Sequence, residues 1–404
     1  MEWKEVRLGD VCTRVCSGGT PKSTNLSYYG GEIPWLNTKE IDFNRIYSTE
    51  KTITDSGLNN SSAKWIVPNT VTVAMYGATA GKSCIVKVPM TTNQACCNLT
   101  INDEVADYEF VYYSLKNDYT TLASLANGGA QQNLNAQIIK DYVLKMPSLA
   151  DQRRIASILS SLDRKIELNN KINADLEEMA QAIFKNWFVD FEPFKDGKFV
   201  DSELGMIPEG WKVGRLDEIA DVVGGSTPSK AKPEYYTQKG IAWLTPKDLS
   251  NHPAVYTSRG EIDITKEGYN STSTKLMPKG TILFTSRAPI GYISIAQNDI
   301  CTNQGFKSLV PKKAGTCFLY CFLKYVTPEI ENKSTGSTFK EASGSLMKSL
   351  KVIMPEQKVF EDFETIVSPL FARIESLEKK SSRLSLLRDT LLPRLMSGEL
   401  EVPE

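Results

Sequence analysis

The sequence contains one histidine in 404 residues, His252 in the stretch "LSNHPAV". A single histidine excludes classical zinc fingers, histidine-rich metal sites and most Ser-His or Cys-His nucleophile pairs. The turn-like surroundings of His252 favour a loop residue over a catalyst. Carboxylate metal sites stay open, although no closely spaced acidic group stands beside a candidate base.

Long apolar runs and cysteine frameworks are also missing. No run reaches the roughly 18 apolar residues of a membrane span. The start, "MEWKEVRLGD", carries acids where a signal peptide would be apolar. We therefore expect a cytoplasmic protein without a membrane segment. The eight cysteines lack disulfide or zinc spacing, so pairs such as Cys317 and Cys321 are interpreted as small buried thiols.

The stretch "AMYGATAGKSC", residues 74–84, resembles a nucleotide-binding P-loop but is one residue too short. The motif needs four residues between its glycines, and here only Ala78, Thr79 and Ala80 intervene. A changed spacing alters which backbone amides converge on a phosphate. The second copy of the stretch, "FTSRAPIGYIS", loses the Gly-Lys-Ser end altogether. We therefore expect a tight turn with variable side chains.

The chain repeats itself once, at a separation of about 208 residues. "WKEVRLGDV" at 3 matches "WKVGRLDEI" at 211, and "IPWLNTKEI" at 33 matches "IAWLTPKDL" at 241. "TTNQACCNL" at 91 likewise matches "CTNQGFKSL" at 301. The order of the matches is the same in both halves, which makes chance an inadequate explanation. Each repeat mixes short β-like runs with turn residues, typical of a compact α+β domain, and ends in a long helical pattern.

The two helical patterns carry apolar heptad seams in the same phase, each about 39 residues or roughly 58 Å long. We expect the helices to pair as an antiparallel coiled coil, which would give the chain an internal pseudo-twofold. Pro369 predicts a kink or a late helix start. The first seam is Ile155, Leu159, Leu162, Ile166, Asn169, Asn173, Leu176, Ala180, Ile183 and Trp187. The second is Phe363, Val367, Leu370, Ile374, Leu377, Ser381, Leu384, Arg388, Leu391 and Leu395.

The predicted fold class is therefore α+β, with two similar domains joined by two long helices. The expected divisions are a first domain over 1–148, a helix over 149–192, a linker and second domain over 193–354, and a second helix with a tail over 355–404. Two similar domains on a helical spacer suit a ligand with two spaced sites, and duplex DNA is the leading candidate.

Net charge argues weakly against DNA, because it is −1 overall. The charge is uneven, however. Residues 209–354 hold 19 Lys/Arg against 13 Asp/Glu, whereas residues 1–148 hold 13 against 14. We expect either clustering of the basic residues on one face or affinity supplied by a partner.

The order of domain, helix, domain, helix resembles the specificity subunit of type I restriction-modification enzymes over essentially the whole chain. "DQRRIASILSSLDRKIELNNKINADLEEMAQAIFKNWFVDF" at 151 and "LRDTLLPRLMSGELEV" at 387 belong to the resemblance, with the Gly-Gly-Thr-Pro turn and the Trp-Leu pairs. It implies two target recognition domains, each reading half of a split, asymmetric sequence in double-stranded DNA. The helices would separate these domains and dock two methyltransferase (modification) subunits.

The resemblance also implies a non-catalytic subunit without a cofactor. S-adenosylmethionine, ATP and Mg are expected on partner subunits, among them a restriction subunit with ATP-driven translocation that can join the complex. The sequence agrees, because it has no Asn-Pro-Pro-Tyr-type methylation motif, no S-adenosylmethionine glycine motif and no complete P-loop.

Residues that are identical in both repeats are poor candidates for base discrimination if the two domains read different sequences. They are expected to build the domain or to contact phosphates, although Asn and Gln can pair bidentately with adenine. Lys22 and Lys230, beside the Gly-rich turns, are expected to contact phosphates. The shared pairs are Gly18/Gly224, Thr20/Thr227, Pro21/Pro228, Trp35/Trp243, Lys39/Lys247, Asn93/Asn303 and Gln94/Gln304.

Base specificity is expected where the turns match but the side chains differ. Arg287 is the foremost candidate reader, because arginine to guanine is the commonest specific contact, with a solvated or phosphate-bound arginine as the alternative. The differing positions are Tyr76/Ser286, Gly77/Arg287, Lys82/Tyr292, Asn37/Thr245 and Thr38/Pro246. Near the end of the first helix, Trp187, Phe188 and Phe191 either form a partner surface or pack against the second domain.

Two functions of other classes compete with this reading. A fused restriction-methylation enzyme would need catalytic motifs that the sequence lacks. A coiled-coil scaffold that binds proteins without DNA specificity would need no such motifs. Complex formation with a methyltransferase, and site-specific methylation by that complex, would separate the scaffold from the specificity subunit.

Overall fold

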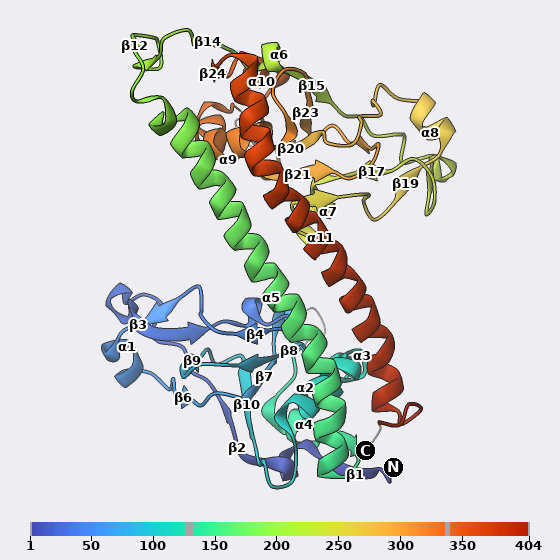
Figure 1. The fold of residues 1–404 in the computed structure, drawn as a ribbon. Helices are drawn as coiled ribbons and strands as arrows, with labels where there is room; N and C mark the ends of the chain where they lie inside the picture. Colours follow the sequence, from blue (N-terminus) through green and yellow to red (C-terminus); the bar gives the residue numbers. More distant parts are fainter. Residues whose placement is uncertain (1, 127–132, 336–339, 403–404) are drawn as a thin grey trace. The chain divides into compact units, whose positions relative to one another are not determined.

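The structure of the protein is a computed structural model that describes residues 2–126, 133–335 and 340–402. It mixes helices with short strands, as the α+β prediction requires (Figure 1). Within the described ranges, no helix combines the length and the apolar character needed to cross a membrane. The eight cysteines are free, and all except the half-buried Cys12 and Cys16 are buried. The prediction of small buried thiols is confirmed for those six.

The chain divides into two compact units, and both long helices contribute to each. The first unit consists of Met1–Ile166 and Arg383–Glu404, and the second of Glu167–Ser382. Helix α5 spans Leu149–Phe188 and helix α11 spans Gln357–Met396. The start of α5 therefore lies with the end of α11 in the first unit. In the second unit, the end of α5 lies with the start of α11. This arrangement confirms the antiparallel pairing of the two helices.

The first unit contains a five-stranded sheet in the order β2-β10-β7-β8-β4, and a four-stranded sheet in the order β5-β3-β9-β6. The central strand β7, "VTVA", is buried at all four positions, typical of a strand covered on both faces. Its edge strand β4 runs parallel to β8, with Arg45 opposite Ile85. The strands are β1 Lys4–Arg7, β2 Cys12–Ser17, β3 Tyr29–Leu36, β4 Arg45–Ile46, β5 Thr52–Ile53, β6 Trp65–Ile66, β7 Val71–Ala74, β8 Ser83–Val86, β9 Met90–Thr92, β10 Cys96–Ile101 and β11 Val143–Met146.

Helix α2 forms the centre of the first unit's core. It begins where the Asp107 side chain accepts a 2.9 Å hydrogen bond from the Phe110 N–H, a cap that satisfies one free helix donor. Phe110, Tyr112 and Tyr113 are at most 1% exposed. The helical segments are η1 Leu8–Val11, η2 Leu26–Tyr28, η3 Thr38–Glu40, α1 Asp55–Asn59, η4 Gly77–Thr79, α2 Tyr108–Asn117, α3 Tyr119–Ser124 and α4 Ala136–Asp141.

The second unit repeats this plan. Its five-stranded sheet has the order β15-β23-β20-β21-β18, which matches the first unit strand for strand, including a parallel edge strand, β18. The separate pair β14 and β24 matches β1 and β11. The strands are β12 Phe199–Val200, β13 Ile207–Pro208, β14 Lys212–Arg215, β15 Ala220–Gly224, β16 Tyr236–Thr237, β17 Trp243–Leu244, β18 Tyr256–Thr257, β19 Asp263–Ile264, β20 Ile282–Ser286, β21 Ile290–Ala296, β22 Cys301–Thr302, β23 Lys307–Pro311 and β24 Lys351–Met354.

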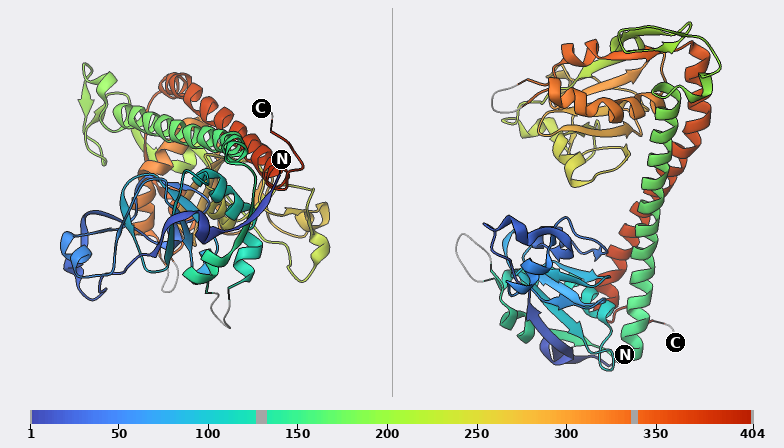
Figure 2. Two further views of the ribbon diagram at one scale, coloured as in Figure 1. Left: turned by 90° about the horizontal axis from the view of Figure 1, so that it is seen from below. Right: turned by 90° about the vertical axis from the view of Figure 1, so that its left-hand side faces the viewer.

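Helix α9 lies against this sheet (Figure 2). Its buried side chains belong to an aromatic core. Phe188 and Phe191, at the end of α5, are buried in the same core, and the Phe188 ring lies 4.9 Å from Phe318. Of the two predicted alternatives, Phe188 and Phe191 therefore follow the second: they pack against the second domain and do not form a partner surface. The helical segments are η5 Glu192–Phe194, α6 Leu216–Ile219, η6 Pro233–Tyr235, α7 Pro246–Asn251, α8 Lys266–Asn270, α9 Thr316–Lys333 and α10 Gly344–Ser349.

The predicted heptad seams are buried or half-buried at every position. In the second unit the polar positions of the two seams meet, because Asn169 Nδ2 donates a 3.1 Å hydrogen bond to Ser381 Oγ. Burial of such a pair favours one helix register over its neighbours. The late start expected from Pro369 is wrong, since α11 begins at Gln357 and continues through it. Pro369 is exposed, so its ring meets solvent rather than the core.

A buried ionic cluster joins the first unit's sheet to both long helices. The carboxylate of Asp163 on α5 accepts hydrogen bonds of 2.6 Å from the Tyr113 hydroxyl and from Arg388 Nη1 on α11. Arg45 of β4 approaches Asp163 to 4.0 Å and Glu109 to 3.1 Å, with its side chain 3% exposed. Burial alone would lower the pKa of Arg388, but its hydrogen bonds to Asp389 and Asp163 raise it above the usual value.

Candidate nucleic-acid interface

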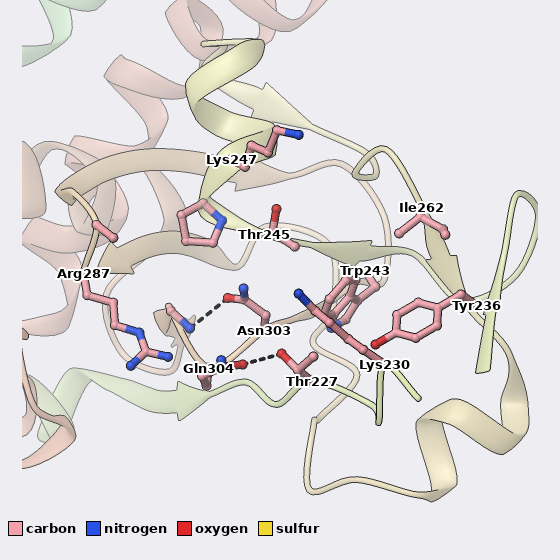
Figure 3. Close-up of a pocket in the computed structure, with 13 residues that line it drawn as sticks. Thr227, Lys230, Tyr236, Trp243, Thr245, Lys247, Ile262, Arg287, Asn303 and Gln304 are labelled. Carbon is pink, nitrogen blue, oxygen red and sulfur yellow. Dashed lines mark hydrogen bonds between the residues drawn. The ribbon is translucent and has the colours of Figure 1, made fainter. Parts of the chain in front are cut away.

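The second unit has a surface groove of about 610 Å³ at the ends of β17, β20 and β22 (Figure 3). Six of the seven residues predicted to contact DNA in this half line it, and their side chains come from four separate turns. The lining residues are Thr227, Lys230, Tyr236, Trp243, Thr245, Pro246, Lys247, Ile262, Arg287, Ala288, Asn303, Gln304 and Gly305. The seventh predicted residue, Tyr292, lies on β21, where its hydroxyl is 3.5 Å from Ser250 Oγ.

The groove is cationic. Lys230, Lys247 and Arg287 line it, and none of its described lining residues is acidic. The nearest carboxylate to Arg287 is Glu341 at 3.4 Å, which lies 3.3 Å from Lys307 as well. Lys247 approaches Glu261 only to 3.9 Å, with both side chains more than 70% exposed, so this pair contributes little. The groove therefore presents positive charge and amide groups to a bound anion.

The floor of the groove is a turn fixed by two aromatic residues. Trp243 is 4% exposed and donates a 3.1 Å hydrogen bond from Nε1 to the carbonyl of Ser226. The Tyr236 hydroxyl donates a 2.6 Å hydrogen bond to the carbonyl of Pro228. The two rings meet edge to face at 5.9 Å. These contacts hold the Gly-rich turn in one conformation and so place Thr227 and Lys230 at the groove.

The first unit builds the same turn with the same residues. Trp35 Nε1 donates a 2.9 Å hydrogen bond to the Gly19 carbonyl, and the Tyr29 hydroxyl donates a 2.6 Å bond to the Pro21 carbonyl. The shared tryptophan therefore holds the turn together in both copies. The tyrosine was missed, although in each repeat it follows the turn proline by eight residues, which was a detectable signal.

One of the shared pairs is misaligned by a residue. A Cβ on Gly18 would lie 2.2 Å from the Thr92 carbonyl oxygen, and a Cβ on Gly225 would lie 2.1 Å from that of Thr302. A Cβ on Gly224 would meet nothing within 4 Å. The structural counterpart of Gly18 is thus Gly225, and the predicted pairing with Gly224 is wrong. Two adjacent glycines in the second copy left the sequence register ambiguous.

Asn93 and Asn303, which are shared by the two repeats, stabilise the turns that follow β9 and β22. Asn303 Oδ1 accepts a 2.8 Å hydrogen bond from the Gly305 N–H, and Asn93 Oδ1 accepts a 3.0 Å bond from Ala95. Such Asx contacts are a structural role. The Gln304 side chain accepts a hydrogen bond from the hydroxyl of Thr227. In the first unit, the Gln94 N–H is 3.5 Å from Thr20 Oγ1. Base reading by these four amides stays a prediction.

The differing pair Asn37 and Thr245 begins a short helix in each unit. The Thr245 N–H and hydroxyl each donate a 2.7 Å hydrogen bond to Asp248 Oδ2. The Asn37 N–H donates a 2.9 Å bond to Glu40 Oε1. Each residue thereby occupies the N-terminal cap of η3 or α7. In the first unit, Asn93 Nδ2 also donates a 3.2 Å bond to Asn37 Oδ1, which brings two predicted residues together.

The other predicted residues of the first unit lie on turns, and all except the half-buried Lys82 are exposed. Tyr76 is 40% exposed, and Lys22 is exposed beside the Gly-rich turn. Lys82 forms a 2.6 Å ion pair with Asp42. Lys39 forms an ion pair with Glu50. No nucleotide cradle forms at Gly81-Lys82-Ser83, because the stretch joins β7 to the strand β8 rather than opening a helix. The interpretation as a tight turn is confirmed.

The sole histidine, His252, is exposed at the end of α7, which confirms it as a loop residue. In the described parts of the chain, no group of three or more His, Cys, Asp or Glu side chains is placed to hold a metal ion. The residues gathered at the groove are suited to electrostatic and hydrogen-bonding recognition.

Comparison with known proteins assigns both halves to one kind of domain. The sequence profile of the family described as "Type I restriction modification DNA specificity domain" matches residues 1–178 and again 208–385. The MjaIX type I restriction enzyme specificity subunit of Methanocaldococcus jannaschii is 32% identical over 100% of this chain and 94% of its own length. The HindI specificity subunit of Haemophilus influenzae is 26% identical over 72% of this chain and 77% of its own length.

A solved structure has the same fold. The crystal structure of the type I restriction-modification S subunit from M. genitalium superposes with a TM-score of 0.60 at 20% sequence identity. The match covers 98% of this chain and 96% of that one.

Proposed function

We propose that this chain, which belongs to the family of type I restriction-modification DNA specificity proteins, selects a bipartite DNA target through its two repeated domains. In this proposal each unit reads one half of an asymmetric sequence. The observation that carries it is the groove of the second unit. There, Lys230, Lys247 and Arg287 surround the side chains of Asn303 and Gln304 with no acid among the described lining residues.

The chemistry of the groove divides into two kinds of contact. Lysines on exposed turns neutralise phosphates, which gives affinity without sequence information. Arg287 can form two parallel hydrogen bonds to one guanine, which gives discrimination. The structural counterpart of Arg287 in the first unit is Tyr76, and the predicted pairing of Arg287 with Gly77 is wrong, because Met75 and Ser286 make matching backbone hydrogen bonds to Ala95 and Gly305. Gly77, at φ +79, instead matches Ala288, at φ +53. The two units would therefore read different sequences with the same scaffold.

The subunit itself is proposed to be non-catalytic. Two methyltransferase subunits would dock on it, and a restriction subunit with ATP-driven translocation would join them. S-adenosylmethionine, ATP and Mg would bind to those partners. The resemblance of the chain to specificity subunits over its full length supports this division.

Co-expression with a type I methyltransferase subunit from the same genome tests the proposal. We expect a stable complex that methylates adenine at one recurring split sequence in the genomic DNA of the host, read by single-molecule sequencing. A complex that forms without any recurring methylated sequence would favour a protein-binding scaffold. No complex at all would contradict the docking of methyltransferase subunits.

Arg287→Ala should weaken binding of the complex to its own target by about 10- to 100-fold, or about 1–3 kcal/mol, and leave non-specific DNA nearly unaffected. The fold of the groove should persist, because Glu341 remains paired with Lys307. Binding is measured by fluorescence anisotropy with target and scrambled duplexes.

Lys247→Ala is the matched control on the same groove. It should weaken binding to both duplexes about equally and lower the salt slope of log K by roughly 1, as expected for one phosphate contact. Equal weakening of both duplexes by Arg287→Ala would instead make Arg287 a phosphate contact.

A further inference from the structure

A glutamate of the long helix α11 binds the edge of the second unit's sheet. The Val255 N–H donates a 2.7 Å hydrogen bond to Glu378 Oε1, and the Tyr256 N–H donates a 3.0 Å bond to Oε2. Each carboxylate oxygen thus accepts one of two consecutive backbone donors. Hydrogen bonds to an ionised acceptor are about twice as strong as neutral ones.

The bound segment is the start of β18, the last strand of its five-stranded sheet. An edge strand has one side of its backbone unpaired unless another group covers it. The other side of β18 is paired with β21, since the carbonyl of Val255 accepts a 2.7 Å hydrogen bond from Ile295. Glu378 therefore accepts hydrogen bonds from two backbone donors at the start of this edge strand.

Along the chain, β18 lies between two groups of residues that line the groove. Thr245, Pro246 and Lys247 precede it, and Ile262 follows it, all lining the groove. The segment from Thr245 to Ile264 contains only short elements, since α7, β18 and β19 are each at most six residues long. Fixing the middle of such a segment limits the motion of both ends.

The carboxylate of Glu378 is half-buried and has acidic neighbours. Burial raises its pKa from the usual 4.5 to about 7, the bonds from Val255 and Tyr256 oppose the rise, and the charges of Glu177 and Glu375 add to it. These two neighbours are themselves engaged, Glu177 with Lys324 and the Tyr320 hydroxyl, and Glu375 with Lys379. The titratable and charged groups around the site are Glu177 of α5, Cys317, Tyr320, Cys321 and Lys324 of α9, Glu364, Glu375 and Lys379 of α11, and Tyr256 of β18 itself.

The first unit fastens the matching strand by different chemistry. There, β4 itself supplies Arg45, whose guanidinium meets Glu109 and Asp163. A guanidinium stays charged throughout the physiological pH range. The two repeats thus share a sheet but differ in how its edge is held to the helices.

We propose that Glu378 is a positioning residue, whose ionised carboxylate holds β18 and the adjoining groove wall against α11. The ionised carboxylate accepts both amides. Protonation places a hydrogen on one oxygen and leaves one good acceptor for two donors. The link from strand position to DNA recognition rests on the proposed function, whereas the pH-sensitive contact does not.

Linkage gives the sign of the effect on stability. Because folding raises the pKa of Glu378, the folded chain binds a proton more tightly than the unfolded chain between about pH 4.5 and 7. Stability of the second unit contributed by this group is therefore greatest at low pH and is lost as the pH rises through that window. The contact with β18 has the opposite sign, because the bonds from Val255 and Tyr256 lower the pKa and so favour the ionised form within the folded unit. Protonation thus weakens this contact even though it stabilises the folded unit as a whole. Glu378→Gln, which cannot ionise, should lose less stability between pH 5 and 7 than the wild type in urea unfolding.

Hydrogen exchange of the assembled complex tests the contact directly. At pH 8, Glu378→Gln should speed exchange of the Val255 and Tyr256 amides by about tenfold, because the glutamine offers one acceptor for two donors. Glu361→Gln is the matched control, since it makes the same chemical change on an exposed part of α11. Unchanged exchange at both amides in Glu378→Gln would overturn the proposal.

A pH profile separates positioning from a merely structural role. The ratio of wild-type to Glu378→Gln methylation efficiency at the recurring target should fall from pH 8 toward pH 6, while the ratio for Glu361→Gln should stay level. A level ratio for Glu378→Gln, beside a changed amide exchange, would refute the link to DNA recognition. A wild-type complex without a recurring methylated site would refute the proposed function, and the exchange experiment would still decide the contact.

Discussion

Asp163→Ala should lower the free energy of unfolding of the first unit by about 3 kcal/mol, near the lower end of the range for breaking a buried ion pair. The carboxylate is 9% exposed and accepts hydrogen bonds from Tyr113 and Arg388. Without this carboxylate, the positive charges of Arg45 and Arg388 are only partly neutralised. The effect stays near the lower end because Arg45 keeps Glu109 and Arg388 keeps Asp389. Urea unfolding, followed by hydrogen exchange in peptides of α2, reports on this unit alone.

Asp389→Ala is the control, because Asp389 pairs with the same Arg388 but is 56% exposed. Exposed pairs contribute about 0–1 kcal/mol, so this change should be small. If the two substitutions cost the same, the cluster does not fasten the sheet to the helices. A cost confined to Asp163 would show that burial, not pairing as such, decides the contribution.

The repeat and the heptad seams made most of the fold predictable. Apolar periodicity depends on neighbours that are close in the sequence, so Ile155, Leu159 and their counterparts could be assigned to a buried stripe without tertiary information. The same phase in both helices indicated their pairing. The prediction of a late helix start at Pro369 was wrong, because it relied on proline alone and ignored the packing of the neighbouring helical turns. Val367 and Phe371 are buried on either side of this expected start, and their packing maintains the helix.

The site was predictable only in part. Turn chemistry identified Lys230, Asn303 and Arg287 as candidates, because the turns were recognisable in both repeats. Only the structure shows that these three residues line one groove. Sequence gave no indication of Glu378 or Glu341, whose partners lie 123 and 54 residues away. Contacts of this kind depend on how elements pack, and a lone glutamate in a helix carries no pattern. The ionic cluster was hidden in the same way, since Arg388 occupies a seam position that was expected to be apolar.

Exchange of the first recognition domain for that of another specificity subunit should replace one half of the methylated sequence and leave the other half unchanged. The sequence places the boundary at residue 148. The core of the first unit extends beyond it, however, because Leu392, Leu395 and Met396 of α11 are buried there. A chimera of residues 1–148 alone must therefore keep Arg45 and Tyr113, which contact the helices. A second chimera, which exchanges 1–166 and 383–404 together, moves the whole unit with its own contacts.

Both chimeras should methylate the same new half-sequence, and the original target should fall to background in each. The reciprocal exchange of residues 193–354 serves as the control and should alter the other half only. If the second chimera is active and the first is not, the buried contacts with α11 account for the difference, and urea unfolding of the first chimera would show the lost stability. If either exchange changes both halves at once, the two units do not read DNA independently, because recognition by separate domains requires that each half of the target follow its own unit.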